Sequence, residues 1–129
     1  MVLDTSALLA LLFDEPEAEE FRTAVEADAT RLVSAATLLE TALVIEARKG
    51  EPGGRELDLL IHKAEIVVVA VDAEQVSEAR RAYRRFGKGR HAAGLNFGDV
   101  FAYAASRTSG EPLLFKGDDF AKTDIARVA

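Results

Sequence analysis

Five acidic residues in four separate segments are the side chains of this sequence that are best suited to do chemistry. Asp4 follows the first apolar run, Glu40 interrupts an apolar stretch, Asp99 follows a glycine, and Asp118 and Asp119 follow the last apolar run. If these segments meet, each like-charged pair costs about 4 kcal/mol at ~4 Å and an effective dielectric of ~20. Such a cluster must therefore hold protons or divalent cations. Carboxylate oxygens are hard ligands that suit Mg²⁺, with Mn²⁺ as a substitute.

The elements that must position these acids alternate along the chain between short β-branched runs and longer amphipathic stretches. This alternation predicts an α/β fold with a central, mostly parallel, twisted sheet and helices on both faces. Ligands bind at the carboxyl ends of the strands in such a sheet, and Asp4, Asp118 and Asp119 follow strand ends, whereas Glu40 and Asp99 lie in expected helices. The segment 50–54 is rich in glycine and proline and predicts a break between helices. The expected strands are 1–4, 31–34, 66–71 and 113–115, with a weak strand or tail at 125–128, and the expected helices are 6–13, 17–27, 36–48, 55–63, 73–86 and 96–106.

Length and composition indicate one domain spanning residues 1–129. No apolar run approaches the ~18 residues needed to cross a bilayer, so no membrane association is expected. Asp4 lies inside the first apolar stretch and no basic segment precedes it, which argues against a signal peptide. The absence of cysteine excludes disulfides and thiolate metal sites, and a cytoplasmic protein is the simplest interpretation.

The net charge of −6 argues against binding to nucleic acid, but the charge is unevenly distributed. Of the sixteen lysine and arginine residues, six lie between positions 80 and 90, where there is no acidic residue. We call these six residues, Arg80, Arg81, Arg84, Arg85, Lys88 and Arg90, the basic strip. A basic strip beside an acidic pocket suits a metal-dependent nuclease, whereas an ordinary solvated helix face is the simpler explanation.

Four motifs together resemble the PIN-domain ribonucleases, and among these the VapC toxins of bacterial toxin–antitoxin pairs. They are V-L-D-T-S-A-L at the start, S-A-A-T-L-L-E-T-A reaching Glu40, G-L-N-F-G-D reaching Asp99, and L-L-F-K-G-D-D-F-A-K-T-D-I near the end. The motifs cover nearly the whole chain in the order of the family. The resemblance implies a three-layer α/β/α PIN domain and a Mg²⁺-dependent endoribonuclease that cleaves structured RNA such as tRNA, rRNA or mRNA. It also implies a VapB-like antitoxin as partner, and a homodimer, for which the apolar run 8–13 could supply an interface.

The resemblance carries Asp4 and Asp99 over as metal ligands, and Glu40 as a catalytic residue that orients water, acts as the base or helps to bind a second ion. Each has a structural explanation as well. Asp4 could cap a helix, and Asp99 could form a capping box with Asn96. Glu40 is harder to explain in this way, because its helix is apolar nearly all round and is expected to be buried. Gly98, a poor helix former before Asp99, indicates that the backbone there approaches another group closely.

The last acidic position is ambiguous. Many PIN domains have T-R-D-x-D-F where this chain has F-K-G-D-D-F, so the first family aspartate falls on Gly117. Either Asp118 or Asp119 could turn toward the pocket and act in catalysis, and Asp124 is a more distant candidate. Candidate substrate-binding residues are Thr5 and Ser6 at the start of a helix, Arg90 and His91 in the loop before Asp99, and Arg84 and Arg85 in the basic strip, which could instead contact the antitoxin.

No Ser–His or Cys–His pair is evident, so water is the expected nucleophile, activated by a metal ion. One alternative is a non-catalytic RNA- or protein-binding module on a PIN scaffold, although such a module would be expected to lose its carboxylates. A DNA nuclease similar to the flap nucleases is disfavoured by the small size. A haloacid-dehalogenase-type phosphotransferase is disfavoured because Ser6 stands where its second aspartate would be.

Overall fold

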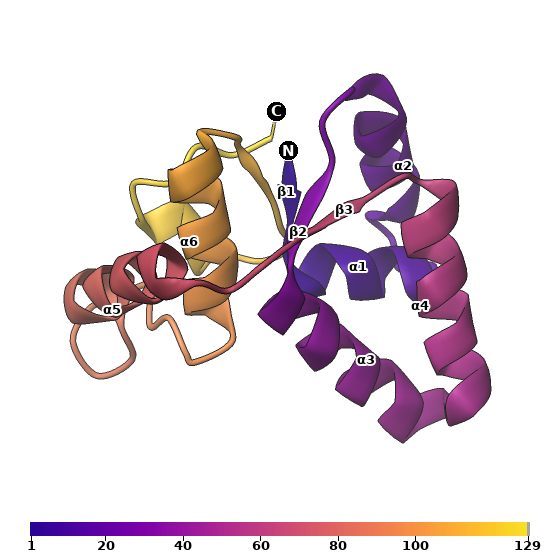
Figure 1. The fold of residues 1–129 in the computed structure, drawn as a ribbon, viewed down its shortest axis with the longest axis horizontal. Coiled ribbons are helices and arrows are strands. Elements are labelled where there is room, and N and C mark those ends of the chain that lie inside the picture. Colours follow the sequence, from indigo (N-terminus) through magenta and orange to yellow (C-terminus); the bar gives the residue numbers. More distant parts are fainter. Residues whose placement is uncertain (129) are drawn as a thin grey trace.

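A four-stranded sheet forms the centre of the molecule, with the strand order β3-β2-β1-β4 and parallel pairing throughout. The computed structural model describes residues 1–128 (Figure 1). Every crossover between strands contains at least one helix, as parallel strands require. The strands are β1 (Val2–Leu3), β2 (Leu32–Ser34), β3 (Val67–Val69) and β4 (Leu113–Leu114). The helices are α1 (Thr5–Leu12), α2 (Ala18–Ala27), α3 (Ala35–Lys49), α4 (Glu51–Lys63), α5 (Ala73–Phe86) and α6 (Asp99–Ser109), with a 3-10 turn, η1, at Phe120–Lys122.

Successive strand residues point to opposite faces of the sheet and build two separate cores. Val2 and Leu113 pack with α5 and α6, whereas Leu3 and Leu114 pack with α1 and α2. Figure 1 shows the sheet between these two groups of helices, with α5 and α6 on one side and α1 to α4 on the other. The predicted three-layer α/β/α architecture is therefore confirmed. None of the helices within residues 1–128 combines the length and the apolar character needed to cross a membrane.

Helix α4 begins inside the glycine- and proline-rich segment that was expected to separate two helices. Gly50, with φ of 67°, ends α3, and α4 starts at the very next residue. Pro52 lies in the first turn of α4, where its missing N–H costs nothing. A Cβ at Gly53 would be 2.8 Å from the carbonyl oxygen of Ile45, so glycine lets α4 pack closely on α3. The prediction that α4 begins at residue 55 was wrong because these glycines serve packing rather than a loop.

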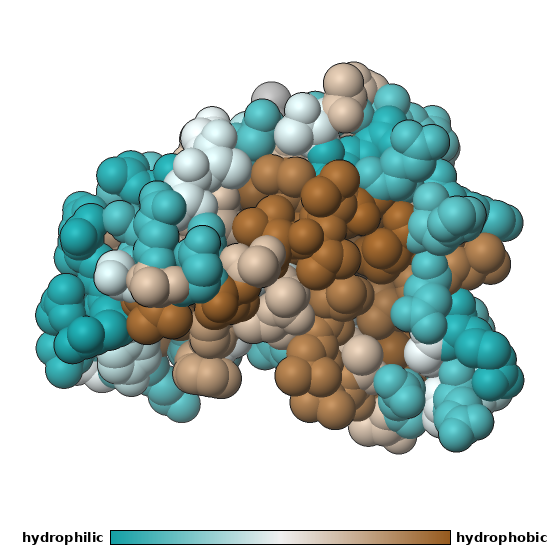
Figure 2. Space-filling view, in the orientation of Figure 1, coloured by the Kyte–Doolittle hydropathy of each residue, from teal (hydrophilic) through white to brown (hydrophobic). Residues whose placement is uncertain are grey.

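Apolar side chains remain exposed on α3 and on the edge strand β3. Leu39 is 60% and Leu43 63% exposed, so the expectation that α3 is buried on nearly all sides was wrong. The buried face of α3 is the narrow row of Thr37, Thr41 and Ile45. Figure 2 shows an apolar area over β3 and α3, to which the exposed Val67 and Val68 belong. By contrast, no residue of the run 8–13 is fully exposed, so that run lies largely in the core of the domain.

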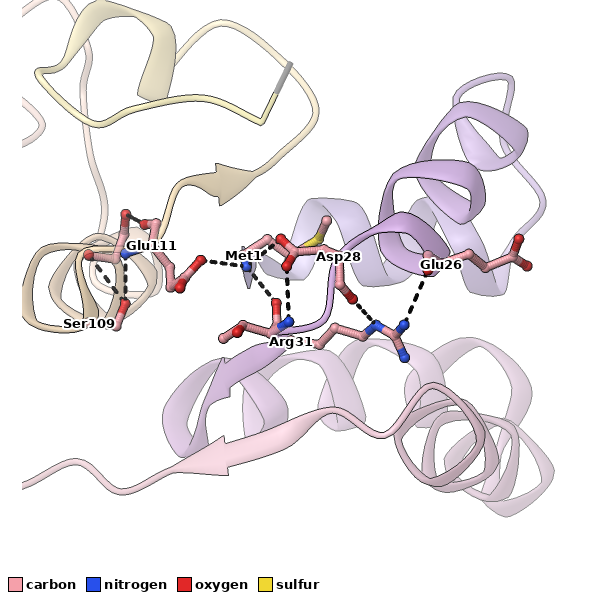
Figure 3. A network of polar contacts seen from close by, with 8 residues as sticks. Met1, Glu26, Asp28, Arg31, Ser109 and Glu111 are labelled. Atoms are coloured by element: carbon pink, nitrogen blue, oxygen red, sulfur yellow. Dashed lines mark hydrogen bonds and ion pairs between the residues drawn. The ribbon is translucent and has the colours of Figure 1, made fainter.

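A network of ion pairs holds the start of β1, at the edge of the sheet opposite the one at which Asp4 emerges. The α-amino group of Met1 donates to Asp28 at 2.8 Å, to Glu111 at 3.0 Å and to the carbonyl of Thr30 at 2.6 Å (Figure 3). The hydrogen bond from this amino group is the main cause of the lowered pKa of Asp28. The network fixes β1 between its two neighbours and thereby sets where Asp4 emerges.

Candidate active site

Asp4 is the most buried acidic side chain at the carboxyl edge of the sheet. It follows β1, caps α1 by accepting from the backbone N–H of Ser6 at 3.1 Å, and is 5% exposed. Burial raises the pKa of Asp4 to about 6 against the lowering effect of its hydrogen bonds from Ser6, and the charges of Asp99 and Glu40 raise it further. Asp4 therefore caps α1 and also carries a negative charge that its burial disfavours. Capping alone does not require a pKa this high.

Ser6 links two strand ends that are far apart in the sequence. Its hydroxyl donates to Asp4 Oδ2 at 2.6 Å and accepts from the backbone N–H of Lys116 at 2.9 Å. Lys116 lies in the segment that leaves β4 and leads to Asp118 and Asp119. The Ser6 hydroxyl thus holds the Asp4 carboxylate and positions the last acidic segment at the same time.

Glu40 reaches the same edge of the sheet from α3 and is held by residues on both sides. The hydroxyl of Thr5 donates to Glu40 Oε1, and the hydroxyl of Thr41 lies 3.3 Å from that of Thr5. On the other side, a Cβ at Gly98 would overlap the Glu40 carboxylate. The close backbone approach predicted at Gly98 is therefore confirmed, and the group that it approaches is Glu40. Glu40 is half-buried rather than buried, because α3 exposes its outer face.

Asp99 stands at the start of α6 in a reciprocal capping box. Asn96 Oδ1 accepts from the backbone N–H of Asp99, and Asp99 Oδ2 accepts from that of Asn96, both at 3.0 Å. The predicted capping box is confirmed. Burial raises the pKa of Asp99 against the hydrogen bond from Asn96, and the charges of Asp119 and Glu40 add to the increase.

Asp118 and Asp119 both lie on the exposed turn after β4, and they differ in what they influence. The charge of Asp119 raises the pKa of Asp99, whereas Asp118 contributes to no such shift. Asp124 lies elsewhere, where it accepts from Tyr103 Oη at 2.6 Å and pairs with Arg85 at 3.1 Å. Partial burial opposes the low pKa of Asp124, which the Tyr103 hydrogen bond and the neighbouring guanidinium groups produce.

The acidic cluster, by which we mean Asp4, Glu40, Asp99 and Asp119, has an excess of negative charge. No lysine or arginine within residues 1–128 forms an ion pair with any of the four. With the side chains as they stand, no group of three acidic or histidine residues in this part of the chain is close enough to enclose a metal ion. The buried Asp4 carboxylate, the raised pKa of Asp99 and the all-oxygen donor set nevertheless suit a hard divalent cation. Thr37 Oγ1, one turn before Glu40, is also buried without a hydrogen-bond partner among the described residues.

The remaining candidates lie on the surface near α5. Arg85 pairs with Asp124 and stacks over Phe86, whereas no ion pair is formed by Arg84 or Arg90 in the described part of the chain. The Nδ1 atom of His91 accepts from the backbone N–H of Ala93 at 3.0 Å, and its ring packs edge-on against Phe86. His91 therefore supports the loop before α6. The structure brings together Asp4, Thr5, Ser6, Glu40, Asp99 and Asp119, and it adds Thr41 and the backbone of Lys116, whose contribution no sequence pattern had indicated.

A parallel sheet with acidic side chains gathered at its carboxyl edge agrees with the comparison with known families. The model of the family "PIN domain" matches residues 1–126, and the chain belongs to this family. Within it, the chain belongs to the VapC ribonucleases, the toxins of VapBC toxin–antitoxin systems. It is 66% identical to Ribonuclease VapC30 of Mycobacterium tuberculosis over 129 residues, covering 100% of this chain and 98% of the relative. It is 62% identical to Ribonuclease VapC of Mycolicibacterium smegmatis, covering 99% of each chain.

Solved structures with little sequence identity share the fold. The crystal structure of VapC20 from Mycobacterium tuberculosis, described as a sarcin–ricin loop cleaving toxin, superimposes with a TM-score of 0.79 at 18% identity, covering 98% of this chain and 97% of that chain. VapBC-1 from nontypeable Haemophilus influenzae gives a TM-score of 0.74 at 15% identity, covering 98% and 94%.

Proposed function

We propose that this ribonuclease is a Mg²⁺-dependent endonuclease that hydrolyses a structured RNA at the acidic cluster. The observation that carries the proposal is the burial of Asp4 beside Glu40 and Asp99 without a basic partner in residues 1–128. A fold under no functional demand would not retain this arrangement, because burying an unpaired carboxylate costs free energy.

Asp4 and Asp99 would hold the cation, as the chemistry of their oxygens and their raised pKa values support. When bound, Mg²⁺ supplies positive charge at the scissile phosphate and lowers the pKa of water. Glu40 orients the attacking water and accepts its proton, and Thr5 fixes the Glu40 carboxylate for this role. Both aspartates after β4 are exposed, but Asp119 adds negative charge near Asp99, whereas Asp118 has no such effect.

The basic strip would bind the phosphate backbone of the RNA. Arg84 and Arg90 are exposed, and neither forms an ion pair within the described residues, so no carboxylate there competes with phosphate for them. The guanidinium group of Arg90 lies over the ring of Tyr83. Arg85 is already paired with Asp124, so we assign it a weaker part than its neighbours. Thr5 and Ser6, at the start of α1, are committed to the Glu40 and Asp4 carboxylates rather than free for the substrate.

The partner that controls this activity would be a VapB-like antitoxin. The solved relatives include toxin–antitoxin complexes, such as those from Klebsiella pneumoniae and Rickettsia felis. An acidic cluster without a basic partner invites a basic side chain from such a protein. We also propose that the protein forms a homodimer and that it acts in the cytoplasm, where RNA substrates are found.

The proposal is tested by incubating total bacterial RNA with the antitoxin-free protein in Mg²⁺, in EDTA, and as the variant Asp99→Asn. Asparagine can still accept the hydrogen bond from Asn96, so the variant should keep its fold. We expect discrete fragments only from the wild-type protein with Mg²⁺, and a loss of about 100-fold or more in the variant. Cleavage that persists in EDTA or in a folded Asp99→Asn protein contradicts the assignment. Metal-dependent RNA binding without any cleavage would favour the non-catalytic binding module.

A further inference from the structure

An apolar cleft lies between α5 and α6 and has no assigned role. Its volume is about 620 Å³, within the range of sites that bind small organic groups. Three aromatic rings contribute to its walls, together with aliphatic side chains and two arginines. The lining residues are Val76, Ala79, Arg80, Tyr83, Arg84, Phe97, Val100 and Phe101.

The most prominent wall of the cleft is the ring of Phe97, which is 79% exposed. Phe101, one turn further on, meets this ring edge-on, with 5.1 Å between the centroids, and so restricts its orientation. Tyr83 and Val76 line the cleft from α5 and are exposed as well. An exposed and supported aromatic ring is costly in water and is well suited to stacking against a flat apolar ligand.

The charge of the cleft indicates what kind of ligand this is. Arg80 and Arg84 are the charged residues of its lining, both are positive, and neither forms an ion pair within residues 1–128. A ligand that offers an aromatic surface together with negative charge satisfies both features. A nucleotide of RNA does so, because its base stacks while its phosphates pair with guanidinium groups.

The wall of the cleft is also adjacent along the chain to a residue of the acidic cluster. Phe97 lies two residues before Asp99, and Val100, in the cleft wall, follows Asp99 directly. Between them, the backbone of Gly98 lies against the Glu40 carboxylate. A base held by Phe97 would therefore belong to a nucleotide next to the one whose phosphate reaches the acidic cluster.

We propose that the cleft between α5 and α6 binds an unpaired base of the RNA substrate, stacked on Phe97, with Arg80 and Arg84 on the adjoining phosphates. This inference rests on the proposed ribonuclease function and gives it a requirement for unpaired bases beside the cleavage site. A second copy of this chain is a less suitable occupant. A two-fold contact through the cleft would bring its two arginines toward those of the partner, with no acidic residue in the lining to neutralise them.

The test is the binding of a fluorescent RNA hairpin with an unpaired loop, measured by anisotropy in EDTA to prevent cleavage. A second probe is the same hairpin with abasic nucleotides in the loop. We expect Phe97→Ala to weaken binding of the first probe by about 5-fold to 150-fold and to leave binding of the abasic probe unchanged. Phe97→Trp should restore the affinity, because tryptophan offers a stacking surface.

Two matched controls separate base stacking on Phe97 and phosphate binding by Arg84 from the general effects of losing an exposed apolar or basic side chain. Leu59→Ala removes another exposed apolar side chain, on α4, and should change neither affinity. Arg84→Gln should reduce the salt dependence of binding by about one unit of slope, whereas Arg55→Gln, on α4, should not.

If Phe97→Ala binds each of the two probes as tightly as wild-type protein does, the inference is overturned and the nuclease assignment stays intact. A dimer that becomes monomeric on Phe97→Ala, measured by sedimentation, also overturns it, because the cleft is then an interface between copies. Wild-type protein that neither binds nor cleaves RNA would reject the proposed function itself.

Discussion

The backbone of Gly98 lies directly against the carboxylate of Glu40, so closely that a Cβ at position 98 would overlap the carboxylate oxygens. The two residues come from different helices, since Glu40 lies in α3 and Gly98 directly precedes α6. With φ of −67°, Gly98 has an ordinary backbone conformation. Glycine is therefore required at this position for space and not for backbone freedom, and the space that it leaves is occupied by a candidate catalytic group.

Replacing Gly98 with alanine should displace the Glu40 carboxylate and lower RNA cleavage by about 10-fold to 100-fold, with little effect on stability. The control is Gly54→Ala in α4, where the added Cβ would also meet a carboxylate, that of Glu46, with 3.0 Å to its Cδ. Glu46 is exposed and can move away, so Gly54→Ala should retain activity and gain up to about 1 kcal/mol of stability. Cleavage assays and urea unfolding of both variants check this, and an active Gly98→Ala protein would refute it.

Thr5 should act through Glu40 rather than on the substrate. Thr5→Val removes the hydroxyl that donates to Glu40, whereas Thr5→Ser keeps it. We expect Thr5→Val to lower kcat by about 10-fold or more while KM stays nearly constant, and Thr5→Ser to remain close to wild type. If both variants lose activity equally, the hydroxyl is not the reason.

The two neighbouring aspartates after β4 should differ in effect. Asp119 influences Asp99 electrostatically, so Asp119→Asn should weaken Mg²⁺ binding and cleavage, whereas Asp118→Asn should change either by less than about twofold. Titration of Mg²⁺ against cleavage rate measures both effects. A larger loss in Asp118→Asn would reverse the assignment.

The stability of the metal-free protein should depend on pH through Asp4. Its pKa is about 6 in the folded protein and 3.8 when unperturbed, so the folded state binds a proton more tightly than the unfolded state. The contribution of Asp4 to the free energy of unfolding should therefore increase as the pH falls from about 7 toward 4, by on the order of 3 kcal/mol. Asparagine also caps helices well, so Asp4→Asn should keep the fold and lose this dependence. Urea unfolding in EDTA at pH 7 and pH 5, compared between the two proteins, measures the difference.

Mg²⁺ should stabilise the protein and should compete with the proton that binds to Asp4. At pH 7, added Mg²⁺ should raise the Tm of the wild-type protein, because the ion binds only the folded acidic cluster. The increase should be smaller at pH 5, where Asp4 is largely protonated, and absent in the double variant Asp4→Asn, Asp99→Asn. A Tm that rises equally in the double variant would place the ion elsewhere.

The alternation of strands and helices was sufficient to predict helices on both faces of the sheet and the edge at which Asp4, Asp118 and Asp119 lie, because the carboxyl ends of parallel strands share one edge. The gathering of Glu40 and Asp99 at that edge was expected from the family resemblance. The start of α4 could not be predicted in the same way. Glycine and proline have the same local preference in a loop as in a close contact between helices, and only the packing of Gly53 on Ile45 distinguishes the two.

Exposure was equally hard to predict from local pattern. The apolar sequence of α3 indicated burial, yet Leu39 and Leu43 face outward, because no described element of the chain covers that side. The choice between Asp118 and Asp119 depends on how the turn after β4 is held by Ser6, and that contact joins residues 110 positions apart. The cleft at Phe97 depends on how α5 and α6 pack, which neither helix encodes alone.

The contact between Ser6 and Lys116 couples the acidic cluster to the pairing of β1 with β4. The Ser6 hydroxyl holds the Asp4 carboxylate and accepts from a backbone N–H that lies 110 residues away along the chain. Strand β4 also pairs directly with β1, from which Asp4 emerges. Local unfolding that separates β4 from β1 should therefore release both supports of Asp4 at once, so that amide protons of this strand pair and the candidate site should be lost in one cooperative step.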